Sequence, residues 1–104
     1  MSRIADLTRF PQDGSYSVSC AGLPLLVVRR RSAWFVYANR CPHTGESLDP
    51  LGGSVASEDG LLLTCQRHAA QFVADTGECV GGPCQGQFLE PVPFTVTNDG
   101  LYLD

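Results

Sequence analysis

The sequence predicts an all-β protein of antiparallel sheets, arranged as a sandwich or a barrel. Short runs rich in β-branched and aromatic residues recur along the chain, and several of them alternate as half-buried strands do. The 11 glycines and 7 prolines lie mostly between these runs, where turns are expected. A length of 104 residues suits one domain with a core of its own, so we expect a single domain over residues 1–104.

The first half of the chain predicts three strands, two of which pair as a hairpin. Only the first few residues have any helical character, and it is weak. The run 16–20 (Tyr-Ser-Val-Ser-Cys) alternates apolar and polar side chains. The runs 25–28 and 33–38 flank an arginine-rich tip, and this arrangement predicts that they pair as a hairpin.

The second half contains two further pairs of expected strands. Residues 61–64 and 71–74 are short apolar runs in the middle of the chain. Near the end, 94–97 and 101–103 flank Asn98-Asp99-Gly100, and Asn and Gly tolerate the positive φ that a tight hairpin turn requires. The glycine-rich stretch from about 40 to 85 is expected to be a loop-rich insertion carried by the flanking strands.

Composition and charge exclude several classes of function. No apolar run approaches the roughly 18 residues that span a bilayer, and no secretory signal is visible, so we expect a cytoplasmic protein without a membrane partner. The net charge of −4 disfavours a nucleic-acid partner. The basic cluster Arg29-Arg30-Arg31 is expected to be a solvated hairpin tip, with a docking patch for an acidic partner as the less favoured interpretation.

The five cysteines are an odd number, which does not favour a disulfide framework. Cys20 lies in a strand pattern with no histidine nearby and is expected to be a small buried apolar residue. A bond between Cys79 and Cys84 is possible, but a reducing cytoplasm argues against it, and packing roles are favoured for both.

Two short motifs bring together the residue types that bind metals. They are Cys41-Pro42-His43 and Cys65-Gln66-Arg67-His68, and they contain the only two histidines of the chain. Two thiolates and two imidazoles suit a tetrahedral zinc ion or a [2Fe–2S] cluster in which cysteines bind one iron and histidines bind the other. Each motif mixes the two ligand types, whereas zinc fingers usually pair like with like, and this difference favours the cluster.

The segments around these motifs resemble the Rieske ferredoxins. The resemblance spans about Tyr16 to Leu103 and is carried by 41–48 (Cys-Pro-His-Thr-Gly-Glu-Ser-Leu), 65–72 (Cys-Gln-Arg-His-Ala-Ala-Gln-Phe), 76–78 (Thr-Gly-Glu) and 82–84 (Gly-Pro-Cys). It implies a Rieske fold, with a base of about 1–39 and 86–104 and a cluster-binding subdomain of about 40–85. It also implies one [2Fe–2S] cluster per chain, held by Cys41, His43, Cys65 and His68, and a shielding loop around residues 81–83.

The chain departs from the respiratory members of this family. Glu46 and Arg67 occupy the positions of two cysteines that form a disulfide in those proteins. Ala70 and Phe72 replace a serine and a tyrosine that donate hydrogen bonds to sulfur. Such bonds stabilise the reduced cluster, so their absence predicts a potential near the low end of the Rieske range, roughly −150 mV.

The resemblance implies a one-electron carrier between a flavin-containing NAD(P)H-dependent reductase and a terminal oxygenase. A catalytic role is not expected, because an oxygenase active site needs two more histidines and a carboxylate, and both histidines are already assigned. Two alternatives stay open. One is a small Rieske-like subunit of a reductase such as nitrite reductase, and the other is a structural zinc-binding module.

Overall fold

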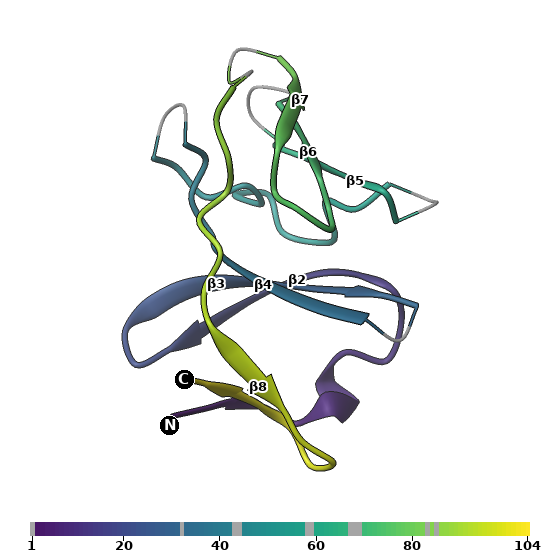
Figure 1. The fold of residues 1–104 in the computed structure, drawn as a ribbon, viewed down its shortest axis with the longest axis vertical. Helices are drawn as coiled ribbons and strands as arrows, with labels where there is room; N and C mark the ends of the chain where they lie inside the picture. The colour runs from purple at the N-terminus through teal and green to yellow at the C-terminus, as the bar shows by residue number, and fades with distance from the viewer. Residues whose placement is uncertain are drawn as a thin grey trace.

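The computed structural model describes residues 2–31, 33–42, 45–57, 60–66, 70–82, 84 and 86–104. Within these residues the strands form three antiparallel sheets of three strands each, stacked as layers (Figure 1). The all-β expectation is confirmed, because the helical content of these residues is limited to one short 3₁₀ turn. No helix in the described part of the chain is long and apolar enough to cross a membrane.

The central sheet is a meander in the order β2-β3-β4. Its strands are β2 (Gly14–Cys20), β3 (Leu23–Arg30) and β4 (Ala33–Ala38). The turn between β2 and β3 is tight because Ala21 and Gly22 both adopt positive φ, at 52° and 81°. The expected hairpin is confirmed, with Val27 opposite Val36 in the register.

The outer sheet covers one face of the central sheet. It contains β1 (Ser2–Ala5), β9 (Leu101–Leu103) and β8 (Phe94–Val96) in the order β1-β9-β8. The weak helical character expected near the N-terminus is limited to the 3₁₀ turn at Leu7–Arg9, whereas residues 2–5 form a strand opposite β9 that was not expected. Distant pairing decided this outcome, because β1 is short and its partner lies at the far end of the chain.

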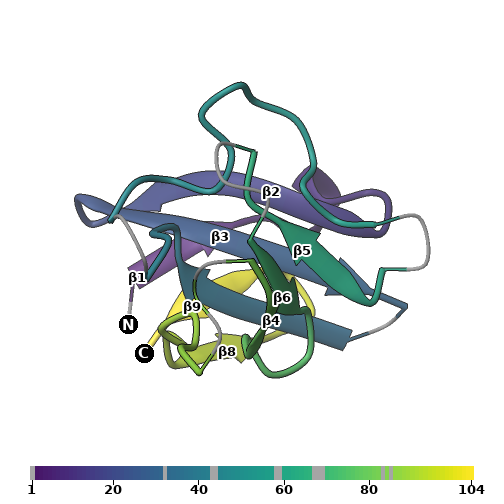
Figure 2. The ribbon, with the colours of Figure 1, turned by 90° about the horizontal axis from the view of Figure 1, so that it is seen from above.

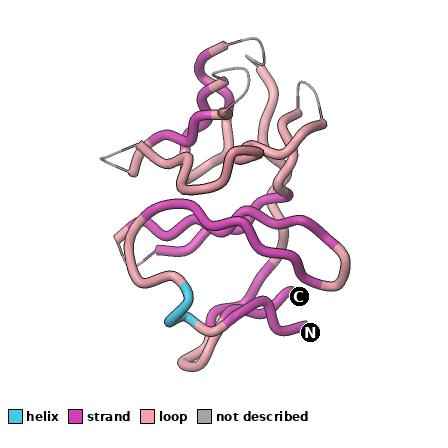
Figure 3. The backbone as a smooth tube through the Cα atoms, turned by 180° about the vertical axis from the view of Figure 1, so that it is seen from behind, coloured by secondary structure: helices cyan, strands magenta, loops and turns pink. Residues whose placement is uncertain are grey.

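The upper sheet covers the opposite face of the central sheet. Its strands are β5 (Leu62–Thr64), β6 (Gln71–Val73) and β7 (Cys79–Gly81), in the order β5-β6-β7. Figures 2 and 3 show this sheet and its long loops gathered on one side of the central meander. The sequence did not predict β7, which pairs irregularly with β6 through Phe72 and Cys79.

Strand β3 separates two cores. Leu25 and Val27 face the core shared with the outer sheet, whereas Leu26 and Val28 face the core beneath the upper sheet. A strand that is covered on both faces reads as a continuous apolar run rather than an alternation. The run Leu25–Val28 is therefore the sequence signal of the three-layer arrangement.

Polar contacts tie the central sheet to the upper layer. The Tyr37 hydroxyl donates a hydrogen bond of 2.7 Å to the carbonyl oxygen of Ala74. Burial and the nearby Asp75 carboxylate raise the pKa of Tyr37 to about 12. Arg30 forms an ion pair with Asp75 at 3.0 Å.

The arginine tip is not the solvated cluster that was expected. Arg30 pairs with Asp75, and Arg29 lies 3.8 Å from Asp13 and donates to the carbonyl oxygen of Phe10. Both side chains are half-buried, while Arg31 is exposed at the turn. Arg29 and Arg30 therefore pair with carboxylates of this chain, because Asp13 and Asp75 approach them from other segments.

Candidate metal centre

Cys41 and Cys65 each begin a turn that is closed by the same kind of backbone bond. The Cys41 N–H donates to the carbonyl oxygen of Glu46 at 2.7 Å, and the Cys65 N–H donates to that of Ala70 at 2.8 Å. Cys41 follows β4, and Cys65 follows β5 directly. The same backbone bond, from residue i to residue i+5, thus follows both cysteines, which come from different layers of the fold.

Hydrogen bonds hold the two turns next to each other. The Gln66 N–H donates to the carbonyl oxygen of Leu48 at 2.9 Å. The Leu48 N–H in turn donates to Asn39 Oδ1 at 3.0 Å, and Asn39 Nδ2 donates to Asp49 Oδ1 at 2.8 Å. Asn39 and Asp49 are both buried, so this bonding also satisfies polar groups that would otherwise be costly to bury.

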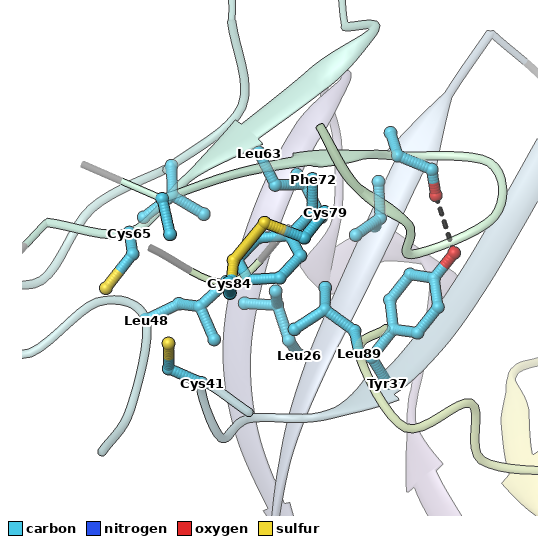
Figure 4. Close-up of a cluster of buried hydrophobic side chains, with 14 residues drawn as sticks. Leu26, Tyr37, Cys41, Leu48, Leu63, Cys65, Phe72, Cys79, Cys84 and Leu89 are labelled. Atoms are coloured by element: carbon cyan, nitrogen blue, oxygen red, sulfur yellow. Dashed lines mark hydrogen bonds between the residues drawn. A yellow bond between two sulfur atoms is a disulfide. The ribbon is translucent and has the colours of Figure 1, made fainter. Parts of the chain in front are cut away.

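The two cysteines share one core and form no disulfide. Cys41 is 0% exposed and Cys65 is 2% exposed, and both are free thiols. Their sulfur atoms point toward the same region beside Leu48 (Figure 4). Two buried and unbridged thiols that approach one space are the donor set that an iron or zinc ion requires, since the thiolate is the metal-binding form.

The histidine partners lie outside the described residues. His43 and His68 follow the two cysteines in sequence, and the structure describes neither of them, nor Arg67. The structure therefore brings together the cysteine half of the expected ligand set. For the two histidines, only their closeness in sequence to Cys41 and Cys65 supports the assignment.

Cys79 and Cys84 form a disulfide, so the expected packing roles as free thiols are wrong. The bond joins Cα atoms that are 5.9 Å apart across a sequence separation of 5. Strand pairing brings Cys79 into the core, and the glycines at 81 and 82 let the chain turn back so that Cys84 meets it. The sequence signal for this bond is the short spacing of the two cysteines around Gly81-Gly82. The reducing cytoplasm that was expected argued against the bond.

The expectation for Cys20 is confirmed. It is buried in the other core, beneath the outer sheet, and remains a free thiol. Its Sγ lies 3.5 Å from the carbonyl oxygen of Arg3, which a weak S–H donor can bond.

The positions that lack hydroxyl groups are fully buried beside the cysteine turns. Ala70 and Phe72 are both 0% exposed, and both belong to the core that contains Cys41 and Cys65. Neither side chain can donate a hydrogen bond to sulfur.

Comparison with protein families decides the family of this chain. The model of the Rieske [2Fe–2S] domain matches residues 2–97. The chain belongs to the Rieske [2Fe–2S] domain family. It accordingly has one [2Fe–2S] cluster as its cofactor, and two free buried thiols in one core fit the cysteine side of such a centre.

Solved structures share the fold of this Rieske domain over nearly its whole length. The ferredoxin of carbazole 1,9a-dioxygenase from Nocardioides aromaticivorans IC177 is 24% identical, with a TM-score of 0.79 over 97% of this chain and 93% of that one. A ferredoxin of Sphingomonas yanoikuyae B1 is 24% identical, with a TM-score of 0.77 and coverage of 98% and 95%. A chain from a complex of reduced oxygenase and oxidized ferredoxin in carbazole 1,9a-dioxygenase is 22% identical, with a TM-score of 0.77 and coverage of 97% and 89%. A search of curated proteins finds no match.

Proposed function

We propose that this Rieske domain is a one-electron carrier that passes electrons from a flavin-containing NAD(P)H-dependent reductase to a terminal oxygenase. The observation that carries the proposal is the pair of free, buried cysteines, each at the start of a like turn and each followed within three residues by a histidine. Solved ferredoxins of similar size and fold, one of them the ferredoxin of carbazole 1,9a-dioxygenase, support the choice of partner class.

We assign Cys41 and Cys65 to one iron and His43 and His68 to the other. When bound, the cluster accepts and releases a single electron. Two imidazoles in place of two thiolates make the ligand set less negative by two charges, so gaining an electron costs less than with four cysteines. Burial of Cys41 and Cys65 keeps water from their sulfur atoms, and the histidine side is expected to exchange the electron with partners.

The chain is expected to carry electrons rather than to catalyse substrate oxidation. A mononuclear iron site of an oxygenase uses two histidines and a carboxylate, and the cluster already requires both histidines of this chain.

The subdomain division at about residues 40 and 85 is likewise proposed, and the upper sheet between Leu62 and Gly81 supports it.

A cytoplasmic location follows from the proposed electron source, because NAD(P)H is the donor. Cys20, which the proposed ligand set leaves as a free thiol, fits a reducing compartment. The single disulfide is compatible with it, since both of its cysteines are buried.

The decisive experiment is an analysis of the chain purified without oxygen. We expect a red-brown protein with about two irons and two sulfides per chain and a rhombic electron paramagnetic resonance signal after reduction. A colourless protein that contains one zinc ion would contradict the proposal. Co-purification with a large reductase chain would instead favour a subunit of an enzyme such as nitrite reductase.

Two variants with matched chemistry test the ligands. Cys41→Ala and Cys20→Ala each remove one buried free thiol, but from different cores. Cys41→Ala and His68→Ala should abolish the visible spectrum, and Cys20→Ala should retain it. Full iron content in Cys41→Ala or His68→Ala would refute the assignment of that residue. Electron delivery is then tested by mixing the intact protein with an NADPH-driven flavin reductase and an oxygenase.

A further inference from the structure

We propose that the Cys79–Cys84 disulfide positions the segment around β7 against the cysteine ligands, and that it does so as a permanent bond protected by burial. The inference rests on the proposed function, because it concerns the surroundings of the proposed cluster. Cys79 and Cys84 would be positioning residues, which act on the cluster through the core rather than as ligands.

The disulfide lies in the core that contains both cysteine ligands. Cys79 is 3% exposed and Cys84 is 1% exposed, and they share that core with Cys41, Cys65 and Leu48. Figure 4 shows the bond packed over Phe72, with the two ligand cysteines on one side of it. A shift of this bond would therefore disturb the packing of the core that contains the proposed ligands.

Between its ends, which are held by the buried residues Gly77 and Leu89, the segment has few other attachments. Among the described residues from Glu78 to Phe88, the two bonded cysteines are the only buried side chains. Val80 is 43% exposed and Phe88 is 56% exposed, so the outer face of the segment does not contact the core. Its interior anchor is thus the disulfide, in place of the apolar side chains that usually fix a strand.

Backbone bonding alone would hold this segment weakly. Strand β7 has three residues, and its register with β6 shifts between Gln71 and Phe72. On its other side an isolated β-bridge joins Glu78 to Phe88. The Cys79 N–H donates one hydrogen bond to the carbonyl oxygen of Gln87, and the Gln87 N–H donates one to that of Cys84. So short a strand, which ends in one glycine and is followed by another, loses much chain entropy on ordering, and a covalent loop of this size removes part of that cost.

Burial also explains how the bond persists in a reducing compartment. Opening it takes two electrons and two protons, which convert one S–S bond into two S–H groups. The donor is a dithiol, which attacks as a thiolate along the S–S axis and leaves as a disulfide. Such an attack needs access to a sulfur atom, and neither cysteine offers it while the core is closed.

The first test measures whether the bond is protected. The purified holoprotein is incubated with dithiothreitol, alkylated with iodoacetamide and weighed by mass spectrometry, with and without guanidinium. We expect the Cys79–Cys84 bond to stay closed in the native protein and to open once the chain is unfolded. Equal rates of opening in both conditions would overturn the claim of burial protection.

The second test measures positioning. The double variant Cys79→Ala/Cys84→Ala is compared with Cys20→Ala, which loses a buried thiol from the other core. We expect iron loss to a chelator to accelerate on the order of tenfold in the double variant, from the loop entropy that the bond removes. The midpoint potential should rise, because water reaching the centre stabilises its more negative reduced form. Unchanged iron loss and potential would overturn the inference.

Reduced wild-type protein keeps every side chain and therefore separates loss of the bond from loss of the two cysteine side chains. Wild-type protein is unfolded, reduced, and refolded with iron and sulfide under continuous reductant, so that it lacks only the bond. It should show the same faster iron loss. If the wild-type chain binds no iron at all, the proposed function fails by itself, while amide hydrogen exchange at Cys79 and Gln87 still reports whether the bond anchors the segment.

Discussion

At the scale of single residues, the sequence identifies the positions that are expected to tune the centre, but it does not give their surroundings. The absence of hydroxyl groups at Ala70 and Phe72 follows from residue identity alone. That both are completely buried follows only from the packing of the upper sheet on Leu26 and Val28. The expectation of a low reduction potential therefore rests on two buried positions. A hydroxyl group introduced at either position would have little water to bond and would seek a partner within the protein.

Restoring a hydroxyl group at position 70 should raise the midpoint potential. The carbonyl oxygen of Ala70 bonds the Cys65 N–H, so Ala70→Ser places a donor on the turn that carries this cysteine. If its hydrogen bond to sulfur contributes about 1 kcal/mol to the reduced form, the potential rises by about 40 mV. Protein-film voltammetry checks this, with Ala74→Ser as the control, because Ala74 is equally buried but lies on the Tyr37 side of the core. A potential equal to wild type would refute the tuning role.

Tyr37 should make the protein sensitive to alkaline pH. Its pKa rises from 10.0 to about 12 in the folded state, so the fold favours the neutral phenol. The associated stability is complete below pH 10 and is lost as the pH rises toward 12. Tyr37→Phe should lower the free energy of unfolding by about 1 kcal/mol at pH 8, since the bond to Ala74 is lost.

The pH dependence separates this effect from simple packing. Urea unfolding at pH 8, 10 and 11 should show the difference between wild type and Tyr37→Phe shrinking as the pH rises. A constant difference in unfolding free energy between the two proteins across this range would show that the pKa of Tyr37 does not change on unfolding.

At the scale of elements, local signals predicted the strands whose partners are adjacent in sequence. The hairpins β3–β4 and β8–β9 are joined by short turns, and both were expected from their residues. Strands β1 and β7 were missed for different reasons. The partner of β1 is at the opposite end of the chain, and β7 is a strand of three residues with an irregular register.

The turn between β6 and β7 should tolerate no side chain at Gly77. This residue has a φ of +80°, and a Cβ atom there would lie 3.0 Å from a ring carbon of Tyr37 and 3.2 Å from the Cβ of Leu89. Gly77→Ala should therefore lower the free energy of unfolding by about 2–4 kcal/mol, which combines backbone strain with overpacking. Thermal or urea unfolding measures it.

Gly52 provides the matched control for this prediction. Its φ is +83°, nearly the same, but an added Cβ would have no neighbour within 4 Å. Gly52→Ala should cost only the backbone strain, about 1 kcal/mol. Equal losses in the two variants would show that the contacts with Tyr37 and Leu89 do not limit position 77.

At the scale of the whole molecule, two separate cores predict a separation of stability. One core lies between the outer and central sheets and contains Phe10, Val27 and Leu101, whereas the other contains Cys41 and Cys65, the proposed ligands. The sequence suggested a loop-rich insertion in the middle of the chain, and the apolar run in β3 is typical of a strand covered on both faces, but the run does not show which segments cover them.

Removal of the cluster should loosen the upper layer and leave the lower two layers in place. The proposed ligands Cys41 and Cys65 lie far apart in sequence, so the binding energy of the cluster is expected to become folding energy for that layer. After chelation, amide hydrogen exchange in residues 45–57, 60–66 and 70–82 should accelerate at least tenfold, which corresponds to about 1.4 kcal/mol or more of lost local stability. Amides of β2, β8 and β9 should keep their protection, because the apolar side chains of these strands lie in the core that contains neither Cys41 nor Cys65. Loss of protection throughout the chain would show instead that the two cores fold as one unit.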